Sequence, residues 1–88
     1  MVLIWDNKFI RNVKKRIRSH NLSLEELEKN LELFSRNPFH ASLRTHKLSG
    51  KLKDLWAFSC GYDCRILFKF ISETQILLID IGTHDEIY

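Results

Sequence analysis

The second half of the sequence contains three strand-like segments that are joined by short connections. The segments are residues 54–59, 64–70 and 75–81, and all three are rich in aliphatic and aromatic side chains. The connections, residues 60–63 and 72–74, have the length of hairpin turns. Because such turns join neighbouring antiparallel strands, the sequence predicts an antiparallel meander.

The first part of the chain predicts one more strand and two helices. Val2–Trp5 is a short apolar segment that can form a strand. From Lys8 to about Ser19, apolar residues recur at helical spacing while basic residues cover most of the remaining surface. Ser23 and Glu26 form the capping-box pattern that begins a second helix, and Pro38 ends it.

These elements define the expected fold. Two antiparallel helices with a short connection form a helical hairpin, which needs a sheet to cover its apolar stripes. The order β-α-α-β-β-β therefore predicts an α+β domain over residues 1–88, with the hairpin packed on a four-stranded, mainly antiparallel sheet. A chain of 88 residues has no room for a second domain. Residues 39–53 show no clean periodicity and are expected to form a basic loop.

The positive charge is concentrated in the first half of the chain. Residues 1–53 carry 12 Lys and Arg against 5 Asp and Glu, a net charge of +7, whereas residues 54–88 carry a net charge of −4. This asymmetry indicates a polyanionic partner such as RNA, although a basic face can also simply be solvated. The longest apolar runs have four residues, so no membrane partner is expected.

The cysteines and the N-terminus indicate a cytoplasmic protein. Cys60 and Cys64 are spaced neither as a C-x-x-C redox pair nor as half of a zinc finger, so we expect reduced, structural thiols. The first residues, MVLIWDNKF, lack the basic lead of a secretory signal.

Histidines are the main candidates for chemistry. The sequence has no Gly-rich phosphate loop, no H-E-x-x-H motif and no nucleophile elbow. His84 follows the last strand in the segment Gly82-Thr83-His84-Asp85-Glu86. There we expect Gly82 to let the backbone turn and to place the imidazole of His84 at the rim of the sheet.

Three segments resemble the RelE/ParE superfamily of small bacterial toxins, most closely its YafQ-like messenger-RNA endonucleases. They are His46–Gly50, the strand pair 56–68 and, as the strongest signal, Gly82–Tyr88. The resemblance covers nearly the whole chain and implies a β-α-α-β-β-β fold. It also implies ribosome-dependent cleavage of messenger RNA without a metal ion or other cofactor. The implied partners are the ribosome, the message and an antitoxin chain that wraps around the toxin in a hetero-oligomer.

The resemblance also implies roles for individual residues. His84 matches the catalytic histidine of the terminal G-T-H, and His46 matches the histidine that opens H-x-L-x-G. Asp63 matches the acid of the hairpin, Arg65 the strand arginine that contacts phosphate, and Tyr88 a terminal aromatic that helps to hold RNA.

Two positions depart from this pattern. Ser59 stands where YafQ-like sequences have a further histidine, and Asp80 stands where they have an arginine.

General chemistry assigns compatible roles. Metal-free cleavage needs a base for the 2′-hydroxyl, an acid for the 5′-oxygen and a cation on the scissile phosphate. His84 can be the acid, and either His46 or Asp63 can be the base. The expected phosphate-binding and RNA-binding cations are Arg65, Lys47, Lys51 and Lys53. The product would be a 2′,3′-cyclic phosphate.

Two other functions compete with this one. A ParE-like toxin shares the fold but acts without catalysis, by binding DNA gyrase, and a plain basic nucleic-acid-binding domain would need no histidine at the rim. We also expect the sheet face around Trp56, Phe58 and Phe70 to exceed what one small core hides, which would leave it for the antitoxin.

Overall fold

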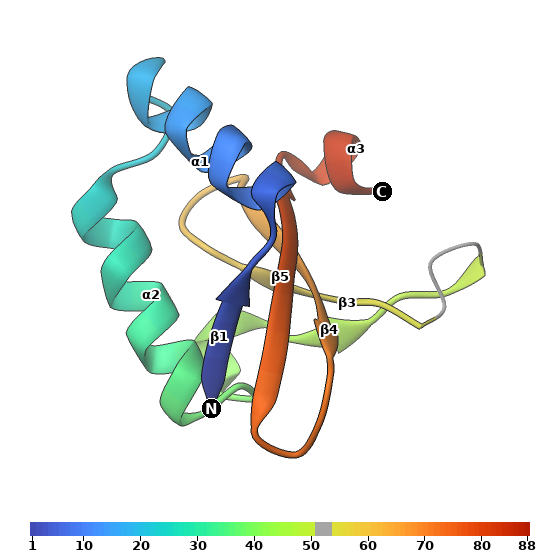
Figure 1. Cartoon of the computed structure of the whole chain (residues 1–88). Coiled ribbons are helices and arrows are strands. Elements are labelled where there is room, and N and C mark those ends of the chain that lie inside the picture. Colours follow the sequence, from blue (N-terminus) through green and yellow to red (C-terminus); the bar gives the residue numbers. More distant parts are fainter. Residues whose placement is uncertain (51–53) are drawn as a thin grey trace.

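The computed structural model describes residues 1–50 and 54–88. In these residues a five-stranded sheet has the order β1-β5-β4-β3-β2 (Figure 1). The strands are β1 (Val2–Trp5), β2 (His46–Lys47), β3 (Trp56–Ser59), β4 (Arg65–Phe70) and β5 (Gln75–Gly82). The helices are α1 (Asn7–Arg18), α2 (Leu24–Arg36), a single 3₁₀ turn (Ala41–Leu43) and the short α3 (His84–Ile87).

The predicted α+β fold and its meander are confirmed. Strands β3, β4 and β5 pair antiparallel in sequence order, and β1 lies parallel to β5 at the edge. The predicted strand count was one too low because β2 pairs antiparallel with β3. The segment 39–53 is therefore not a plain loop. A strand of two residues is too short for any periodicity to reveal it.

Both predicted helices form, and each begins with a side-chain cap. The carboxylate of Asp6 accepts a hydrogen bond from the backbone N–H of Lys8 at 3.1 Å and begins α1. The hydroxyl of Ser23 accepts from the N–H of Glu26 at 3.3 Å and begins α2. The second helix ends at Arg36, before Pro38.

Aromatic packing fastens α2 to the sheet. The ring of Phe34 stacks on Phe58 with centroids 4.0 Å apart and meets Phe68 edge-on at 4.8 Å. Phe58 is completely buried, so the expectation that it is left free for a partner is wrong. The rings of Trp56 and Phe70 pack edge to face at 5.5 Å and are partly buried against the same core. The hydrophobic effect thus uses this sheet face within the domain itself.

A smaller apolar cluster covers the opposite face of the sheet. It contains Leu48 beyond β2, Ala57 of β3, Leu67 of β4 and Ile87 of α3. Burial of Ile87 holds α3 against this face, beyond the end of β5 (Figure 1). The cluster therefore brings together β2 and α3, which carry the candidate histidines. No helix in the described residues is long and apolar enough to cross a membrane.

Candidate active site

Two hydrogen bonds fix the imidazole of His46. The β2–β3 register pairs His46 with Ala57, so both face away from α1 and α2. The Nδ1 atom of His46 lies 2.9 Å from the carbonyl oxygen of Arg44. Because a carbonyl only accepts, Nδ1 must carry a proton, and Nε2 of the neutral ring is then the acceptor.

The phenol of Tyr88 lies on that acceptor. Its hydroxyl is 2.7 Å from Nε2 of His46 and donates the hydrogen bond to the neutral imidazole. Burial raises the pKa of Tyr88, which keeps the phenol protonated at neutral pH, while the charge of Arg65 acts in the opposite direction. The His46 ring is therefore held at both nitrogens, with Nε2 as its basic atom.

His84 contacts the ring of the same tyrosine. Its ring meets the Tyr88 ring edge-on, with centroids 4.6 Å apart. The Nδ1 atom of His84 is 3.3 Å from a carboxylate oxygen of Asp85, and the side chain is 60% exposed. Two imidazoles thus contact one tyrosine in a pocket of about 390 Å³. Its lining is His46, Lys47, Leu48, Ser49, His84 and Tyr88.

A capping box positions His84 at the start of α3. The hydroxyl of Thr83 accepts from the N–H of Glu86, and the Glu86 carboxylate accepts from the N–H of Thr83 at 2.7 Å. The hydrogen bond from the Thr83 N–H to the carboxylate, followed by the Thr83 side chain, lowers the pKa of Glu86. A short helix that frays easily in isolation is therefore fixed at its N-terminus.

Gly82 is needed for a different reason from the one expected. Its backbone does not adopt the left-handed conformation that favours glycine. Instead, a Cβ atom at this position would lie 3.0 Å from Cβ of Glu86. Gly82 therefore lets α3 approach the end of β5 closely, and the turn of the backbone comes from Thr83 and its cap.

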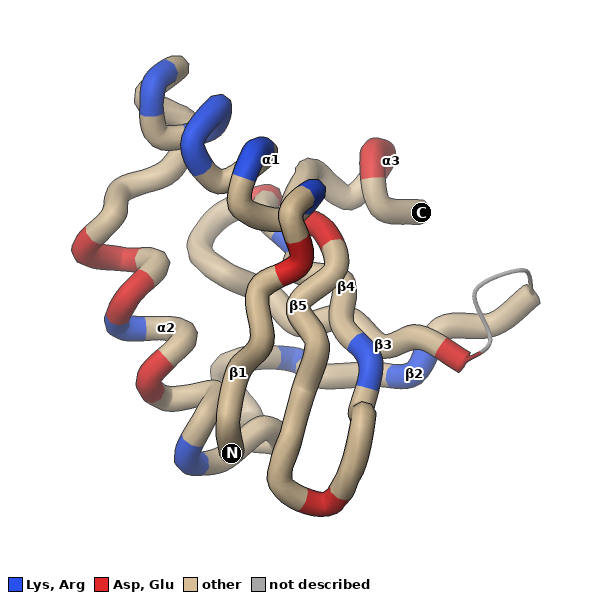
Figure 2. Tube along the Cα trace, in the orientation of Figure 1, with Lys and Arg blue, Asp and Glu red and all other residues tan. Residues whose placement is uncertain are grey.

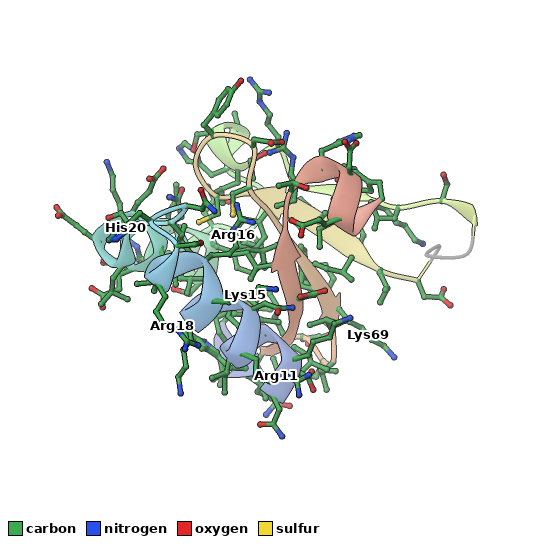
Figure 3. All side chains as sticks on the ribbon, turned by 90° about the horizontal axis from the view of Figure 1, so that it is seen from above. Arg11, Lys15, Arg16, Arg18, His20 and Lys69 are labelled. Atoms are coloured by element: carbon green, nitrogen blue, oxygen red, sulfur yellow. The ribbon has the colours of Figure 1, made fainter. Side chains whose placement is uncertain are left out.

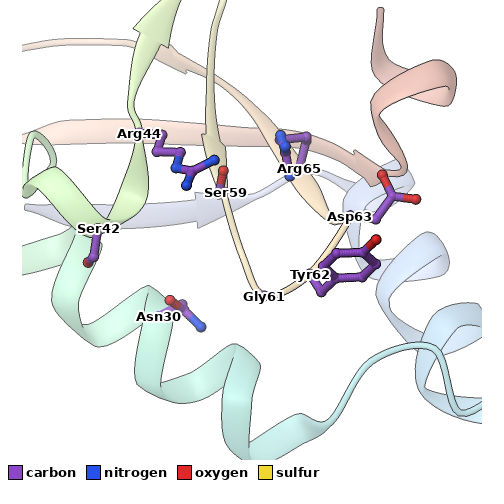
Figure 4. Close-up of a pocket in the computed structure, with 8 residues that line it drawn as sticks. All are labelled: Asn30, Ser42, Arg44, Ser59, Gly61, Tyr62, Asp63 and Arg65. Atoms are coloured by element: carbon purple, nitrogen blue, oxygen red, sulfur yellow. The ribbon is translucent and has the colours of Figure 1, made fainter.

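Arg65 and Asp63 line a second pocket, of about 430 Å³, beside the β3–β4 turn (Figure 4). Figure 4 shows the side chain of Ser59 between those of Arg44 and Arg65. Asp63 adopts a left-handed backbone with φ of 48° in the turn, as a turn aspartate can. Two guanidinium groups and a hydroxyl in one pocket suit an anion such as phosphate.

The structure divides the predicted site residues between these two pockets. His46, Lys47, His84 and Tyr88 lie together, whereas Asp63 and Arg65 line the second pocket. Arg44 connects the two, because its side chain lines the second pocket while its carbonyl holds His46. Lys51 and Lys53 lie outside the described residues.

Arg44 is the site residue that sequence reasoning missed. It stands among several cations of a segment expected to be a loop, and nothing in the pattern separates it from them. Its left-handed backbone, with φ of 51°, becomes visible only in the structure.

The two departures from the family pattern lie in different places. Asp80 accepts a hydrogen bond from the Asn12 amide at 2.6 Å and lies 3.3 Å from the Lys8 ammonium, which ties β5 to α1. Ser59 lies opposite Arg65 in the β3–β4 register and lines the arginine pocket. Asp80 is therefore a structural residue here, and only Ser59 remains next to the candidate chemistry. Within residues 1–50 and 54–88, no three His, Cys, Asp or Glu side chains gather closely enough to hold a metal ion.

The comparison with protein families gives a match over the whole chain. The model for YafQ, a bacterial toxin of type II toxin–antitoxin systems, matches residues 1–88. The chain belongs to the YafQ toxin family. A comparison with curated protein sequences finds no significant match.

Solved structures agree on the fold. YafQ from E. coli strain BL21(DE3) has a TM-score of 0.82 at 18% identity, over 98% of this chain and 96% of that one. The E. coli DinJ–YafQ toxin–antitoxin complex has a TM-score of 0.80 at 18% identity, over 98% and 94% of the two chains. A YoeB/ParE toxin from Agrobacterium tumefaciens has a TM-score of 0.73 at 18% identity, over 96% and 99%. At 18% identity these structures show that this chain shares the fold of RelE/ParE-type toxins.

Proposed function

We propose that this YafQ-family toxin is an endoribonuclease that cleaves messenger RNA on the ribosome without a metal ion. The observation that carries the proposal is that His46 and His84 both contact Tyr88 and line one open pocket. Two imidazoles with different hydrogen-bond partners are suited to act as base and acid in one reaction. A toxin that acts only by binding needs neither.

His46 is the general base in this mechanism. Its Nδ1–H donates to the Arg44 carbonyl, so Nε2 is the atom that can take a proton. When the RNA binds, its 2′-hydroxyl replaces the Tyr88 hydroxyl at Nε2 and gives up its proton there. The 2′-oxygen then attacks phosphorus and the bond to the 5′-oxygen breaks. Asp63 lines the arginine pocket together with Arg65 and remains the other candidate base.

His84 is the general acid, and the arginines hold the phosphate. Protonated His84 gives its proton to the leaving 5′-oxygen, which leaves a 2′,3′-cyclic phosphate and a 5′-hydroxyl. Arg65 and Arg44 stabilise the negative charge that develops on the phosphoryl oxygens, and Lys47 contributes a further positive charge from β2. The ring of Tyr88 offers a surface on which a base can stack.

We further propose a cytoplasmic antitoxin as the resident partner. The support is family membership and the DinJ–YafQ complex of E. coli. In this chain, the edge strand β1 leaves the apolar residues Val2 and Ile4 58% and 39% exposed. An antitoxin segment would cover this surface. Co-purification of the chain from its own locus should yield a second, neighbouring gene product. Isolation as a clean monomer would contradict this part of the proposal.

The decisive experiment combines purified ribosomes, a defined message and the protein, with new RNA ends mapped by primer extension. Wild-type protein should cut the message only when it is translated. His46→Ala and His84→Ala should each lower the cleavage rate by about 10² to 10⁴. Their melting temperatures should change little, because both side chains lie on the surface.

The matched control is His20→Asn. His20 is an exposed histidine in the α1–α2 connection with φ of 60°, a backbone conformation that asparagine tolerates. The His20→Asn variant should cleave at the wild-type rate. Wild-type cleavage by His84→Ala would remove that residue from the mechanism, and growth arrest without any cleavage would favour gyrase binding.

A further inference from the structure

Cys60 and Cys64 face one another at the closed end of the β3–β4 hairpin. Ser59 and Arg65 are paired across the two strands, and Cys60 and Cys64 are the next residues toward the turn. The N–H of Cys60 donates to the carbonyl of Cys64 at 2.9 Å. Residues opposite one another in an antiparallel pair have Cα atoms about 4.5 to 5.5 Å apart, within the range that a disulfide spans. Both side chains are buried on the face that packs against α1 and α2.

The electrostatic surroundings of the two thiols differ. The hydrogen bond from the Cys60 thiol and the positive charge of Arg16 lower the pKa of Cys64, although burial opposes them. The same hydrogen bond, together with burial, raises the pKa of Cys60. The surroundings thereby favour the thiolate on Cys64 over the thiolate on Cys60.

Arg16 is buried beside the sulfur atoms, and one of its N–H donors is unsatisfied in the described residues. Its side chain is only 15% exposed, and its Nε atom is buried without a hydrogen-bond partner in the described part of the chain. Figure 3 shows the sulfur atoms, in yellow, next to the side chain labelled Arg16. A buried guanidinium with an unused donor costs free energy unless a negative charge lies near it. The Glu86 carboxylate, 3.5 Å from a terminal nitrogen of the guanidinium, supplies one such charge, and a Cys64 thiolate would supply an acceptor for Nε.

A pocket adjoins the two cysteines. It has a volume of about 460 Å³ and lies between the α1–α2 connection and the β3–β4 turn. Cys60, Cys64 and Arg16 are among its lining residues. The two cysteines are themselves buried, so a small oxidant must reach the thiols from this adjoining pocket.

We propose that Cys60 and Cys64 form an oxidisable dithiol, with Cys64 as the nucleophile, Cys60 as the resolving thiol and hydrogen peroxide as the class of oxidant. The Cys64 thiolate attacks one peroxide oxygen and the O–O bond breaks. Cys64 becomes a sulfenic acid, and the departing hydroxide takes a proton and leaves as water. The Cys60 sulfur then attacks the Cys64 sulfur. The S–O bond breaks, the disulfide forms, and the hydroxyl leaves with the Cys60 proton as a second water. The two sulfurs lose two electrons and the peroxide gains them.

The disulfide would act on the turn that carries the arginine pocket. Tyr62 and Asp63 lie between the two cysteines, and Arg65 follows Cys64 directly. A guanidinium nitrogen of Arg65 donates to the carbonyl of Cys64 at 3.1 Å. Cross-linking residues 60 and 64 therefore restrains the backbone that positions Asp63 and Arg65. The chemistry itself does not depend on the proposed nuclease activity.

The test is oxidation of the reduced, folded 88-residue chain with hydrogen peroxide, followed by alkylation and mass spectrometry. Wild-type protein should lose both free thiols and two hydrogen masses within one chain, and peptide mapping should join residues 60 and 64. In Cys60→Ser, dimedone should trap a sulfenic acid on Cys64. In Cys64→Ser, the remaining Cys60 should stay largely unreacted.

Arg16→Gln tests the electrostatic part of the proposal, and Arg18→Gln on the exposed side of α1 is its control. Because peroxide reacts with the thiolate, loss of the guanidinium should slow oxidation about tenfold or more. Arg18→Gln should oxidise at the wild-type rate. The proposal is overturned if both thiols of the folded wild type resist peroxide until the chain is denatured, or if the only disulfides formed join two chains. It is equally overturned if Cys60, and not Cys64, carries the trapped sulfenic acid.

Discussion

At the scale of single residues, the tautomer of His46 is set by atoms of two other residues, Arg44 and Tyr88. The Arg44 carbonyl requires a proton on Nδ1, and the Tyr88 hydroxyl donates to Nε2. Neither contact can be inferred from spacing, because Tyr88 is 42 residues away from His46. The sequence pattern therefore identifies the histidine, and the structure identifies which of its nitrogens can act as a base.

Replacing Tyr88 by phenylalanine should separate the hydroxyl from the ring. Tyr88→Phe keeps the aromatic contact with His84 but removes the donor to His46, so we expect the His46 ring to lose its fixed orientation and cleavage to fall about tenfold. The unfolding free energy should drop by about 1 kcal/mol or less, since this hydrogen bond lies at the surface. ¹⁵N chemical shifts of the His46 ring should report mainly the Nδ1–H tautomer in the wild type and a mixture in the variant. An unchanged tautomer in Tyr88→Phe would show that the Arg44 carbonyl alone fixes the ring.

At the scale of elements, α3 depends on its cap more than on its length. Four residues cannot form a stable helix alone, so the Thr83–Glu86 capping box and the burial of Ile87 must hold it. We expect Thr83→Ala to remove about 1 kcal/mol of local stability. Cleavage should fall because His84 and Tyr88 move together, whereas the global melting temperature should hardly change. Hydrogen exchange of the Ile87 and Tyr88 amides would measure the loss directly.

The same cap predicts an acid-sensitive end of the molecule. The pKa of Glu86 is lowered in the folded chain, so its ionised form contributes stability that is present above its ordinary pKa of 4.5. That contribution is lost as the pH falls through the lower, folded value. We expect α3 to fray in this acid range before the sheet unfolds, visible as early changes in the Tyr88 signals. Glu86→Gln, which does not titrate, should abolish this early transition.

The length of an element decides how well the sequence predicts it. Both long helices and the three meander strands were predicted with boundaries within about two residues, because the helices have apolar residues at helical spacing and the strands are apolar segments joined by short turns. The two elements that build the site, β2 and α3, have two and four residues and carry no periodic signal. Tertiary contacts, through Leu48 and Ile87 in the second apolar cluster, stabilise them instead. His46 and Tyr88 could be selected only through their likeness to a family, whereas the place of His84 directly after the last strand also indicated it.

At the scale of the whole molecule, the charges separate by face. Figure 2 shows cations along α1 and anions along α2, with α1 and α3 near the same end of the structure. An ion pair of 3.5 Å between Arg16 and Glu86 joins these two helices. The basic surface of α1 therefore lies near the helix that carries His84, whereas the acidic surface of α2 would repel a polyanion.

This arrangement predicts a salt-dependent association with RNA that α1 controls. Each phosphate that a cation neutralises releases condensed counterions, so binding to the ribosome or to single-stranded RNA should weaken linearly on a logarithmic salt scale, with a slope of about −0.7 for each phosphate contact. Lys14 and Arg18 are exposed on α1 and have no carboxylate partner in the described residues. Removing both charges, in Lys14→Gln with Arg18→Gln, should make the slope shallower by about 1.4. The fold should be unaffected, because neither side chain is in the core.

Co-sedimentation with ribosomes across a salt series measures the slope, and Lys29→Gln on the acidic helix α2 serves as the control that should leave it unchanged. A response to salt that is flat, or equal in all three proteins, would place the RNA on another face of the molecule.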